Sequence, residues 1–163
     1  MVNKPLHRTD QALPDARTLQ RLDHQLCFAL YSSSLLMTKL YKPVLAPLGL
    51  TYPQYLVLLV LWETDRVMVS ELGERLFLDS GTLTPLLKRM ETAGLLTRTR
   101  AVDDERRVIV GLTAAGRALR RKAESVPIAV ACATGCPLDE LTALTAQLQA
   151  LRANVADQVA LAA

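Results

Sequence analysis

Residues 69–113 read VSELGERLFLDSGTLTPLLKRMETAGLLTRTRAVDDERRVIVGLT, and this stretch decides the fold. Ser70 is a plausible N-cap for a short helix over about residues 71–77. Residues 78–81 suit a turn, and a second helix is expected over about residues 82–92. Two short helices joined by a tight turn predict a helix-turn-helix.

A β-hairpin is expected directly after the second helix, which Gly94 would end. Pro85 would lie in the first turn of that helix, where its missing N–H is harmless. Residues 96–100 alternate apolar and polar side chains, and residues 108–110 are β-branched. The charged sequence VDDERR at residues 102–107 lies between them. A helix-turn-helix followed by a hairpin with a basic tip is the order of a winged helix.

A winged helix indicates binding to duplex DNA, with the second helix in the major groove and the hairpin over the minor groove. Phosphate contacts are expected from three basic residues, Lys88, Arg98 and Arg100. Base contacts are expected from the helix start and one arginine, namely Ser80, Thr82, Thr84 and Arg89. The tip residue Arg106 suits a narrow minor groove, and Asp104 would brace its guanidinium through a bidentate pair. A winged helix used only for protein contacts is the alternative.

Apolar-periodic segments flank this core on both sides. One helix is expected from about Asp15 to Ala46, and a buried helix that Pro53 opens is expected next. Thr113 would cap a further helix through about Ala131, and after a break a last helix would run from about Leu138 to Ala160. The apolar faces of these outer helices need a partner, which predicts a homodimer on a pseudo-palindromic double-stranded site.

The expected fold class is therefore mainly α, a winged helix-turn-helix with N- and C-terminal dimerisation helices. Residues 1–15 would be a flexible tail, and residues 16–163 a single domain. Within it, residues 16–52 and 114–163 would form the dimerisation helices, and residues 53–113 the DNA-binding core.

Charge and composition agree with this organisation. The net charge is +3 over 163 residues. Residues 71–122 hold eleven Lys and Arg against seven acidic residues, whereas residues 123–163 hold one Arg against four acidic residues. A basic middle suggests a polyanionic partner. No apolar run reaches the ~18 residues that span a bilayer, and the first twenty residues have no apolar signal core. We expect a cytoplasmic protein without a membrane partner.

Three cysteines in a reducing compartment are not a structural disulfide framework. Cys27, Tyr31, Ser34, Thr38 and Tyr41 share one helix face by their spacing. A thiolate needs hydrogen-bond donors, and tyrosine hydroxyls are suitable ones, so this polar face favours a reactive Cys27. The alternative is a cysteine that simply packs as a small apolar residue.

Cys132 and Cys136 have the spacing C-x₃-C, which raises the question of a metal site. The only other soft ligands are His7 and His24, and they form no matching pair. We therefore predict neither a metal site nor a cofactor.

Residues 78–113 resemble the helix-turn-helix and wing of the MarR family. Together with residues 26–63, LCFALYSSSLLMTKLYKPVLAPLGLTYPQYLVLLVLWE, they resemble its organic-hydroperoxide-responsive repressor (OhrR) subfamily, over about residues 20–160. The resemblance implies a dimeric transcriptional repressor rather than an enzyme. Such a repressor binds operator DNA and leaves it when an organic hydroperoxide oxidises one cysteine.

The resemblance also implies roles for individual residues. Cys27 matches the redox-active cysteine, and Tyr41 and Tyr52 match the tyrosines that support its thiolate. Members of the two-cysteine type carry a resolving cysteine between the last two helices, a role that Cys132 fits, with Cys136 as the alternative. The peroxide would convert Cys27 to a sulfenic acid, and the second cysteine would condense with it to a disulfide.

Cys27 and Tyr41 are fourteen residues apart, about 21 Å along one helix, which is farther than a tyrosine side chain reaches. Either the helix breaks near residues 32–34, or the contact is made across a dimer with antiparallel helices. We expect the second arrangement, with Tyr41 and Tyr52 reaching Cys27 of the other subunit. The disulfide that the resemblance implies between Cys27 and Cys132 would then also link subunits.

Two other functions compete with this interpretation. One is a MarR-type regulator that senses a small phenolic or drug-like ligand, with Cys27 merely packed. The other is a thiol peroxidase, against which the wing argues, because an enzyme that turns over peroxide needs no DNA-binding module.

Overall fold

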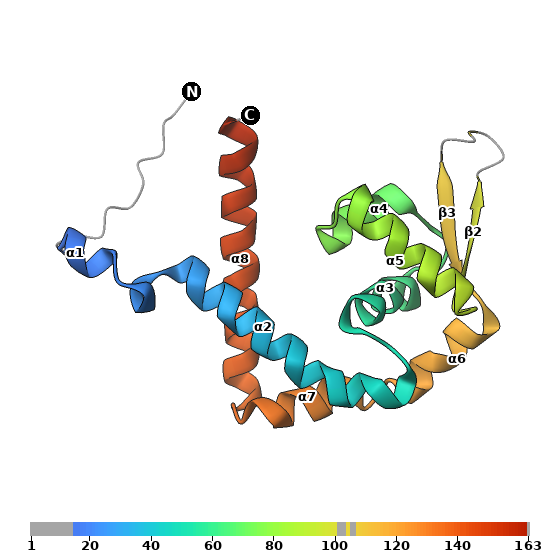
Figure 1. Ribbon diagram of the computed structural model, residues 1–163, viewed down its shortest axis with the longest axis horizontal. Helices are drawn as coiled ribbons and strands as arrows, with labels where there is room; N and C mark the ends of the chain where they lie inside the picture. Colours follow the sequence, from blue (N-terminus) through green and yellow to red (C-terminus); the bar gives the residue numbers. More distant parts are fainter. Residues whose placement is uncertain (1–14, 101–103, 105–106, 163) are drawn as a thin grey trace. The chain divides into compact units, whose positions relative to one another are not determined.

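The computed structural model describes residues 15–100, 104 and 107–162, and it divides into two units, residues 1–38 and 39–163 (Figure 1). The first unit contains α1 (Ala16–Leu19), the 3₁₀ turn η1 (Leu22–His24) and the start of α2 (Leu26–Leu45). The helix expected from about Asp15 is therefore interrupted before Leu26. Gln25 explains this, because its backbone is extended and its side-chain amide donates to the carbonyl of Leu19.

Helix α2 runs unbroken through the serine-rich stretch, so the option of a helix break near residues 32–34, which the sequence left open, is wrong. The hydroxyl of Ser32 donates to the carbonyl of Phe28 at 2.7 Å, and that of Thr38 to the carbonyl of Ser34 at 2.9 Å. These side chains bond back onto their own helix and leave its ladder intact. Helix α2 passes into the 3₁₀ turn η2 (Ala46–Leu48), which ends at Gly49 with a φ of +67°.

Helix α3 (Tyr52–Glu63) is the buried helix that the sequence predicts. The backbone N–H of Thr51 donates to Oε1 of Gln54 at 2.8 Å, and Pro53 lies in the first turn. Six of its twelve side chains are buried, and they come from all around the helix: Tyr55, Val57, Leu58, Val60, Leu61 and Trp62. Helix α3 is thus the centre of the hydrophobic core.

The helix-turn-helix consists of α4 (Val69–Leu76) and α5 (Ser80–Thr92). Ser70 lies inside α4 rather than at its N-cap, because a short strand runs directly into the helix and Met68 takes the cap position. Helix α5 begins two residues earlier than expected, so Pro85 lies in its second turn and not its first. The turn itself contains Phe77, whose φ of 55° is left-handed.

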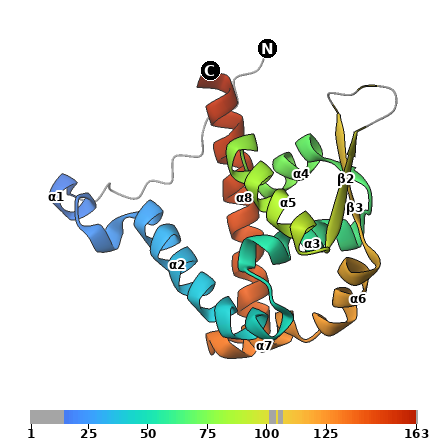
Figure 2. The same cartoon turned by 45° about the vertical axis from the view of Figure 1, so that its right-hand side comes forward.

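A three-stranded antiparallel sheet forms the wing, in the order β1-β3-β2. The expected hairpin is confirmed as β2 (Leu96–Arg100) and β3 (Val108–Leu112). The third strand, β1 (Val67–Met68), was not expected. It pairs with β3 in the register Val67 to Val110 and Met68 to Ile109. Figure 2 shows α5 beside this sheet, with the hairpin extending past it.

The chain ends in α6 (Ala114–Lys122), α7 (Val126–Thr134) and α8 (Leu138–Ala162). Thr113 caps α6 as predicted, since its Oγ1 accepts from the N–H of Gly116 at 3.1 Å. The single helix expected from Thr113 to about Ala131 is wrong, because Pro127 has no N–H to continue the helical ladder and α7 starts anew beside it. Helix α7 in turn extends beyond Ala131 to Thr134, and Gly135, with a φ of +71°, ends it.

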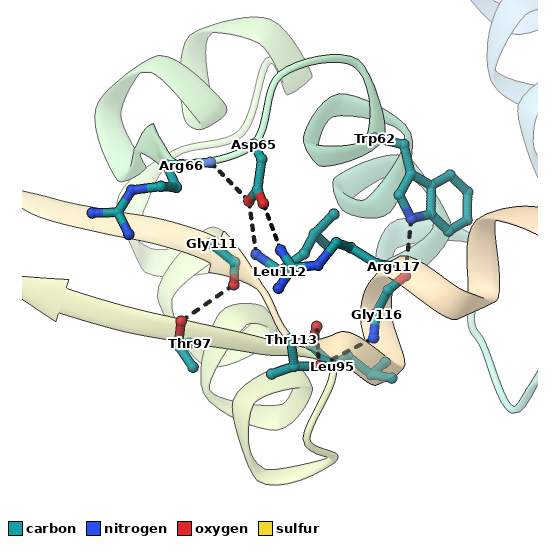
Figure 3. A network of polar contacts seen from close by, with 10 residues as sticks. All are labelled: Trp62, Asp65, Arg66, Leu95, Thr97, Gly111, Leu112, Thr113, Gly116 and Arg117. Atoms are coloured by element: carbon teal, nitrogen blue, oxygen red, sulfur yellow. Dashed lines mark hydrogen bonds and ion pairs between the residues drawn. The ribbon is translucent and has the colours of Figure 1, made fainter.

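Polar contacts join the wing to the helices behind it (Figure 3). Asp65 accepts from the N–H of Leu112 at 2.8 Å and pairs with Nη1 of Arg117 at 2.8 Å. The indole N–H of Trp62 donates to the carbonyl of Gly116 at 3.0 Å. Gly116 lets α6 approach the backbone at Leu95, since a Cβ there would lie 2.1 Å from the carbonyl oxygen of Leu95. The wing is therefore tied through Asp65, just after α3, to helix α6.

The structure confirms a mainly helical fold with a winged helix-turn-helix at its centre. In the part of the chain that it describes, no single helix is both long and apolar enough to cross a bilayer. One bent pair, residues 26–48 with 52–63, passes that test by length and composition, but half of α3 is buried in the core.

Candidate nucleic-acid interface and cysteine sites

Asp79 determines where the second helix of the helix-turn-helix begins. Its Oδ1 accepts from the backbone N–H of Thr82 at 2.9 Å, and its Oδ2 accepts from the hydroxyl of Thr82 at 2.9 Å. These bonds lower the pKa of Asp79 below its ordinary value, so the cap is an ionised carboxylate at a helix N-terminus. The hydroxyl of Thr82 is thus already used as a donor within the protein.

Helix α5 carries exposed side chains that are expected to contact DNA. Ser80, Thr84 and Lys88 are spaced by four residues and so lie along one side of the helix, next to a strip in which Leu83, Leu86, Leu87 and Met90 are buried. Lys88 and Arg89 are exposed. The helix is therefore anchored by its leucines and presents a polar and basic surface.

A hollow of about 360 Å³ lies between this helix and the sheet. It brings together Ser80, Thr84 and Arg98, three of the residues predicted from the sequence. It also includes Ser70 and Arg107, which the sequence interpretation did not assign. Both depend on β1, which places the start of α4 next to the wing, and a two-residue strand leaves no detectable sequence pattern.

Arg98 has a structural role besides the predicted phosphate contact. Its Nε and Nη2 donate to Oε2 of Glu91 at 2.9 and 2.7 Å, and its backbone N–H donates to Oε1 at 3.1 Å. The arginine side chain is 23% exposed, and hydrogen bonding to it lowers the pKa of Glu91. These three bonds tie β2 to the last turn of α5.

The wing tip is described only in part. Arg106 lies outside the described residues, and so does its predicted pair with Asp104. Asp104 is exposed, and its carbonyl accepts from the N–H of Arg107 at 2.9 Å. The guanidinium of Arg107 lies against Met68, with Nε and Nη2 at 3.2 and 3.1 Å from the sulfur. Arg100 is exposed at the end of β2, as a phosphate contact requires.

The two tyrosines assigned to thiolate support are brought together in the second unit. The rings of Tyr41 and Tyr52 are 4.5 Å apart, and Tyr55, which the sequence interpretation missed, lies 6.1 Å from Tyr41. Burial raises the pKa of all three hydroxyls, and for Tyr41 and Tyr55 neighbouring tyrosines add to this effect. The hydroxyls thus stay protonated at neutral pH and remain hydrogen-bond donors. Tyr55 follows Tyr52 by three residues in a helix, a spacing that could have revealed it.

The three cysteines are free and exposed. Cys27 is the second residue of α2, so it lies in a first turn and not in the interior of a longer helix. Cys132 lies in the last turn of α7, and Cys136 follows the end of that helix. Among the described residues, no group of three or more His, Cys, Asp and Glu side chains is placed to hold a metal ion.

The folded chain thus presents an anchored helix with a polar face, a basic wing beside it and an accessible cysteine on another helix. This is the architecture of a winged-helix DNA-binding protein.

A family model described as transcriptional regulator SarA/Rot matches residues 39–122. The chain is 57% identical over 107 residues to the organic hydroperoxide resistance transcriptional regulator of Bacillus subtilis, covering 66% of this chain and 73% of that protein. It is 52% identical over 133 residues to the regulator TtmR of Methylorubrum extorquens, covering 82% and 68%.

Solved structures agree with these relatives. Reduced AbfR bound to DNA superposes with a TM-score of 0.69 at 37% identity, covering 85% of this chain and 96% of that one. AbfR, from Staphylococcus epidermidis, has also been solved with a disulfide formed, at a TM-score of 0.57 and 38% identity, covering 83% and 95%. The chain belongs to the MarR/SarA-like winged-helix family of transcriptional regulators, and it is a MarR-type repressor and not an enzyme.

Proposed function

We propose that this repressor binds operator DNA as a homodimer and is released when an organic hydroperoxide oxidises Cys27, which then forms a disulfide with Cys132. The observation that carries the proposal is an exposed cysteine in the first turn of α2, in a chain 57% identical to a hydroperoxide resistance regulator. The DNA-bound structure of AbfR supports binding to operator DNA, and the disulfide form of AbfR supports disulfide formation by a cysteine. The proposal places the protein in the cytoplasm, with its DNA.

The chemistry begins at the Cys27 thiolate. It attacks the distal oxygen of the hydroperoxide, the O–O bond breaks, and an alcohol leaves once the departing oxygen has taken a proton. The Cys132 thiolate then attacks the sulfenic sulfur, the S–S bond forms, and hydroxide leaves as water. The protonated hydroxyls of Tyr41 and Tyr52 would donate hydrogen bonds to the thiolate, which favours its charged form.

The continuity of α2 supports a donor from the other subunit. Fourteen residues of unbroken α-helix separate Cys27 from Tyr41, about 21 Å along the axis. Tyr41 of the same chain is then out of reach, and two antiparallel copies of α2 would bring the groups together. We therefore propose that Tyr41 and Tyr52 act on Cys27 of the second subunit, and that the Cys27–Cys132 disulfide joins subunits.

On the DNA side, Ser80, Thr84 and Arg89 would contact bases from α5, and the wing would reach the minor groove through Arg106. Lys88, Arg98 and Arg100 would contact phosphates. Thr82 is expected to position the helix start through Asp79 as well as face the DNA. A disulfide between subunits would move the helices that carry the two winged helices and so change their spacing on the two half-sites.

The test is operator binding by the purified, reduced protein before and after one equivalent of cumene hydroperoxide, followed by dithiothreitol. Samples taken early after oxidation should have released the DNA, and the reductant should restore binding. Cys27→Ser should bind DNA and ignore the peroxide, whereas Cys136→Ser should release the DNA in these early samples as the wild type does. A serine variant at position 27 that still leaves the DNA on oxidation would overturn the proposal.

The same samples test the pairing of subunits. On a non-reducing denaturing gel the oxidised wild type should first run as a dimer, and Cys132→Ser should run as a monomer with Cys27 open to overoxidation. An early oxidised sample that contains the Cys27–Cys132 disulfide but runs only as a monomer would contradict the link between subunits.

A further inference from the structure

Cys132 and Cys136 border the same small hollow. The proposed release mechanism does not use these two cysteines as a pair. The hollow has a volume of about 360 Å³ and is otherwise lined by apolar side chains, those of Pro127, Ile128, Ala131 and Leu138. Both thiols are exposed. Two sulfur atoms thus open onto one surface feature, only four residues apart in the chain.

The backbone between them turns out of the helix. The N–H of Gly135 donates to the carbonyl of Cys132 at 3.2 Å, and the left-handed φ of Gly135 ends α7 there. Cys136 follows this turn, and its N–H donates to the hydroxyl of Thr134 at 3.2 Å instead of continuing a helical ladder. Its thiol lies 3.7 Å from the carbonyl oxygen of Thr134, so Cys136 sits in the turn after α7 while Cys132 lies on the helix.

Resting on the proposed function, we propose that Cys136 accepts the disulfide from Cys27, so that the oxidising equivalent ends as a disulfide between Cys132 and Cys136. The Cys136 thiolate attacks the sulfur of Cys132 in the Cys27–Cys132 disulfide. The Cys132–Cys136 bond forms, the Cys27–Cys132 bond breaks, and the electron pair leaves on the Cys27 thiolate. The exchange needs no oxidant beyond the one hydroperoxide molecule that oxidised Cys27.

Proximity favours this direction of exchange. The Cys27–Cys132 bond joins two separate helices, in our proposal from two subunits, whereas Cys132 and Cys136 belong to one turn of one chain. The effective concentration of Cys136 at Cys132 is set by three intervening residues and stays high whatever the other helices do. A disulfide also requires Cα atoms within about 7 Å, which the turn after Cys132 can meet by local adjustment.

The consequence is that the first oxidation leaves the repressor with a different set of free thiols. After exchange Cys27 is a thiol again, and the link between subunits is gone although no reductant has been added. Cys132 is then no longer available as a resolving thiol. A second hydroperoxide molecule would therefore leave Cys27 as a sulfenic acid, and a third would oxidise it to the sulfinic acid.

The experiment follows the sulfur pairing over time in the wild type and Cys136→Ser. Each reduced protein receives one equivalent of cumene hydroperoxide, free peroxide is removed, and samples are quenched in acid, alkylated and mapped by mass spectrometry. In the wild type the Cys27–Cys132 species should form and then fall at least about tenfold, as a Cys132–Cys136 peptide two hydrogen masses lighter accumulates and Cys27 becomes alkylatable. In Cys136→Ser the Cys27–Cys132 species should persist. Operator binding before oxidation verifies that both proteins are folded.

A second variant separates the two proposals. Cys27→Ser treated with glutathione disulfide, which supplies the oxidising equivalent and leaves as two glutathione thiols, should form the Cys132–Cys136 disulfide. A wild-type Cys27–Cys132 bond that persists as in Cys136→Ser would overturn the exchange and leave the proposed function standing. Failure of Cys27→Ser to form the internal disulfide would also overturn it. A wild-type Cys27 that the peroxide does not oxidise would overturn the proposed function instead, while the glutathione experiment still reports on the pair.

Discussion

The winged-helix core and the outer helices of this chain bury their apolar side chains to very different degrees. The buried hydrophobic residues described in the structure all lie between Leu45 and Val130, whereas α8 buries none and α2 buries only Leu45. Large apolar side chains stay exposed on the outer helices, including Leu26, Tyr31 and Leu36 on α2 and Leu144, Val155 and Leu161 on α8. The core is thus completed by one chain, and the outer helices carry the kind of surface that a second chain covers.

The largest loss of stability should come from Gly116→Ala, inside the core. A Cβ at this position would lie 2.1 Å from the backbone oxygen of Leu95, and no side-chain rotation relieves a clash with backbone. Helix α6 and the residues just before β2 would have to separate, which breaks the bonds that Thr113 makes to the carbonyls of Gly94 and Leu95. We expect a loss of about 4 kcal/mol in the free energy of unfolding, more than ordinary overpacking costs, measured by urea denaturation.

Gly111→Ala is the matched control for that substitution. It adds the same methyl group on strand β3, a few residues before α6, but its nearest neighbour, the Cγ of Arg66, lies at 3.5 Å, an ordinary contact. Its stability should stay within about 1 kcal/mol of the wild type. Equal losses in the two variants would show that the core does not depend on the close approach at Gly116.

A pair of leucine truncations measures the contrast between core and outer helices directly. Leu58→Ala removes a side chain with no exposed surface and should lower the free energy of unfolding by about 3 kcal/mol at any protein concentration. Leu144→Ala removes one that is 51% exposed in the single chain. If a second subunit covers it, its cost appears as a raised dimer dissociation constant and a concentration-dependent melting temperature. A concentration-independent loss in Leu144→Ala would contradict a dimer interface on α8.

Replacing the wing-tip residue should affect binding and leave stability unchanged. Arg106→Ala should weaken operator binding by about 1–3 kcal/mol if the tip enters the minor groove. The control is Lys122→Ala, which removes one exposed positive charge from the end of α6, away from the proposed interface. Fluorescence anisotropy on operator DNA selected from a random pool, at one fixed salt concentration, gives both values. Equal affinities in the two variants would remove the wing tip from the interface.

Local signals were enough to predict the core. The alternation in residues 96–100, the Thr113 cap and the apolar helix behind Pro53 each depend on neighbouring residues, and the structure confirms all three. Strand β1 has only two residues and exists because β3, more than forty residues later, offers it hydrogen bonds. The interruption of the first helix depends on one glutamine side chain bonding to a backbone carbonyl, which apolar periodicity does not detect.

Part of the candidate site was also predictable from the sequence. The polar face of α5 follows from helical spacing, and Tyr41 and Tyr52 do lie together. The pairing of Arg98 with Glu91 was not predictable, because it depends on how β2 crosses the last turn of α5. The roles of Cys27, Cys132 and the DNA-contacting residues stay predictions, since they concern a second subunit, an oxidant and a nucleic acid.

The smallest expected effect concerns the tyrosine cluster, which belongs to the core side of the comparison. Tyr41, Tyr52 and Tyr55 have pKa values raised by burial, so the folded protein should ionise them above the ordinary value near 10. A raised pKa in the folded state means that their contribution to stability is complete below pH 10 and is lost as the pH rises through the folded values. Absorbance titration of tyrosinate should therefore show late-ionising groups that return to ordinary behaviour in urea. Tyr41→Phe should remove one of them and lessen the fall in melting temperature above pH 10.

If these hydroxyls also face Cys27 of a second subunit, oxidising that cysteine should shift the titration of the wild type and leave that of Cys27→Ser unchanged. An oxidised wild type with an unaltered titration would confine the cluster to the core and separate it from the thiol.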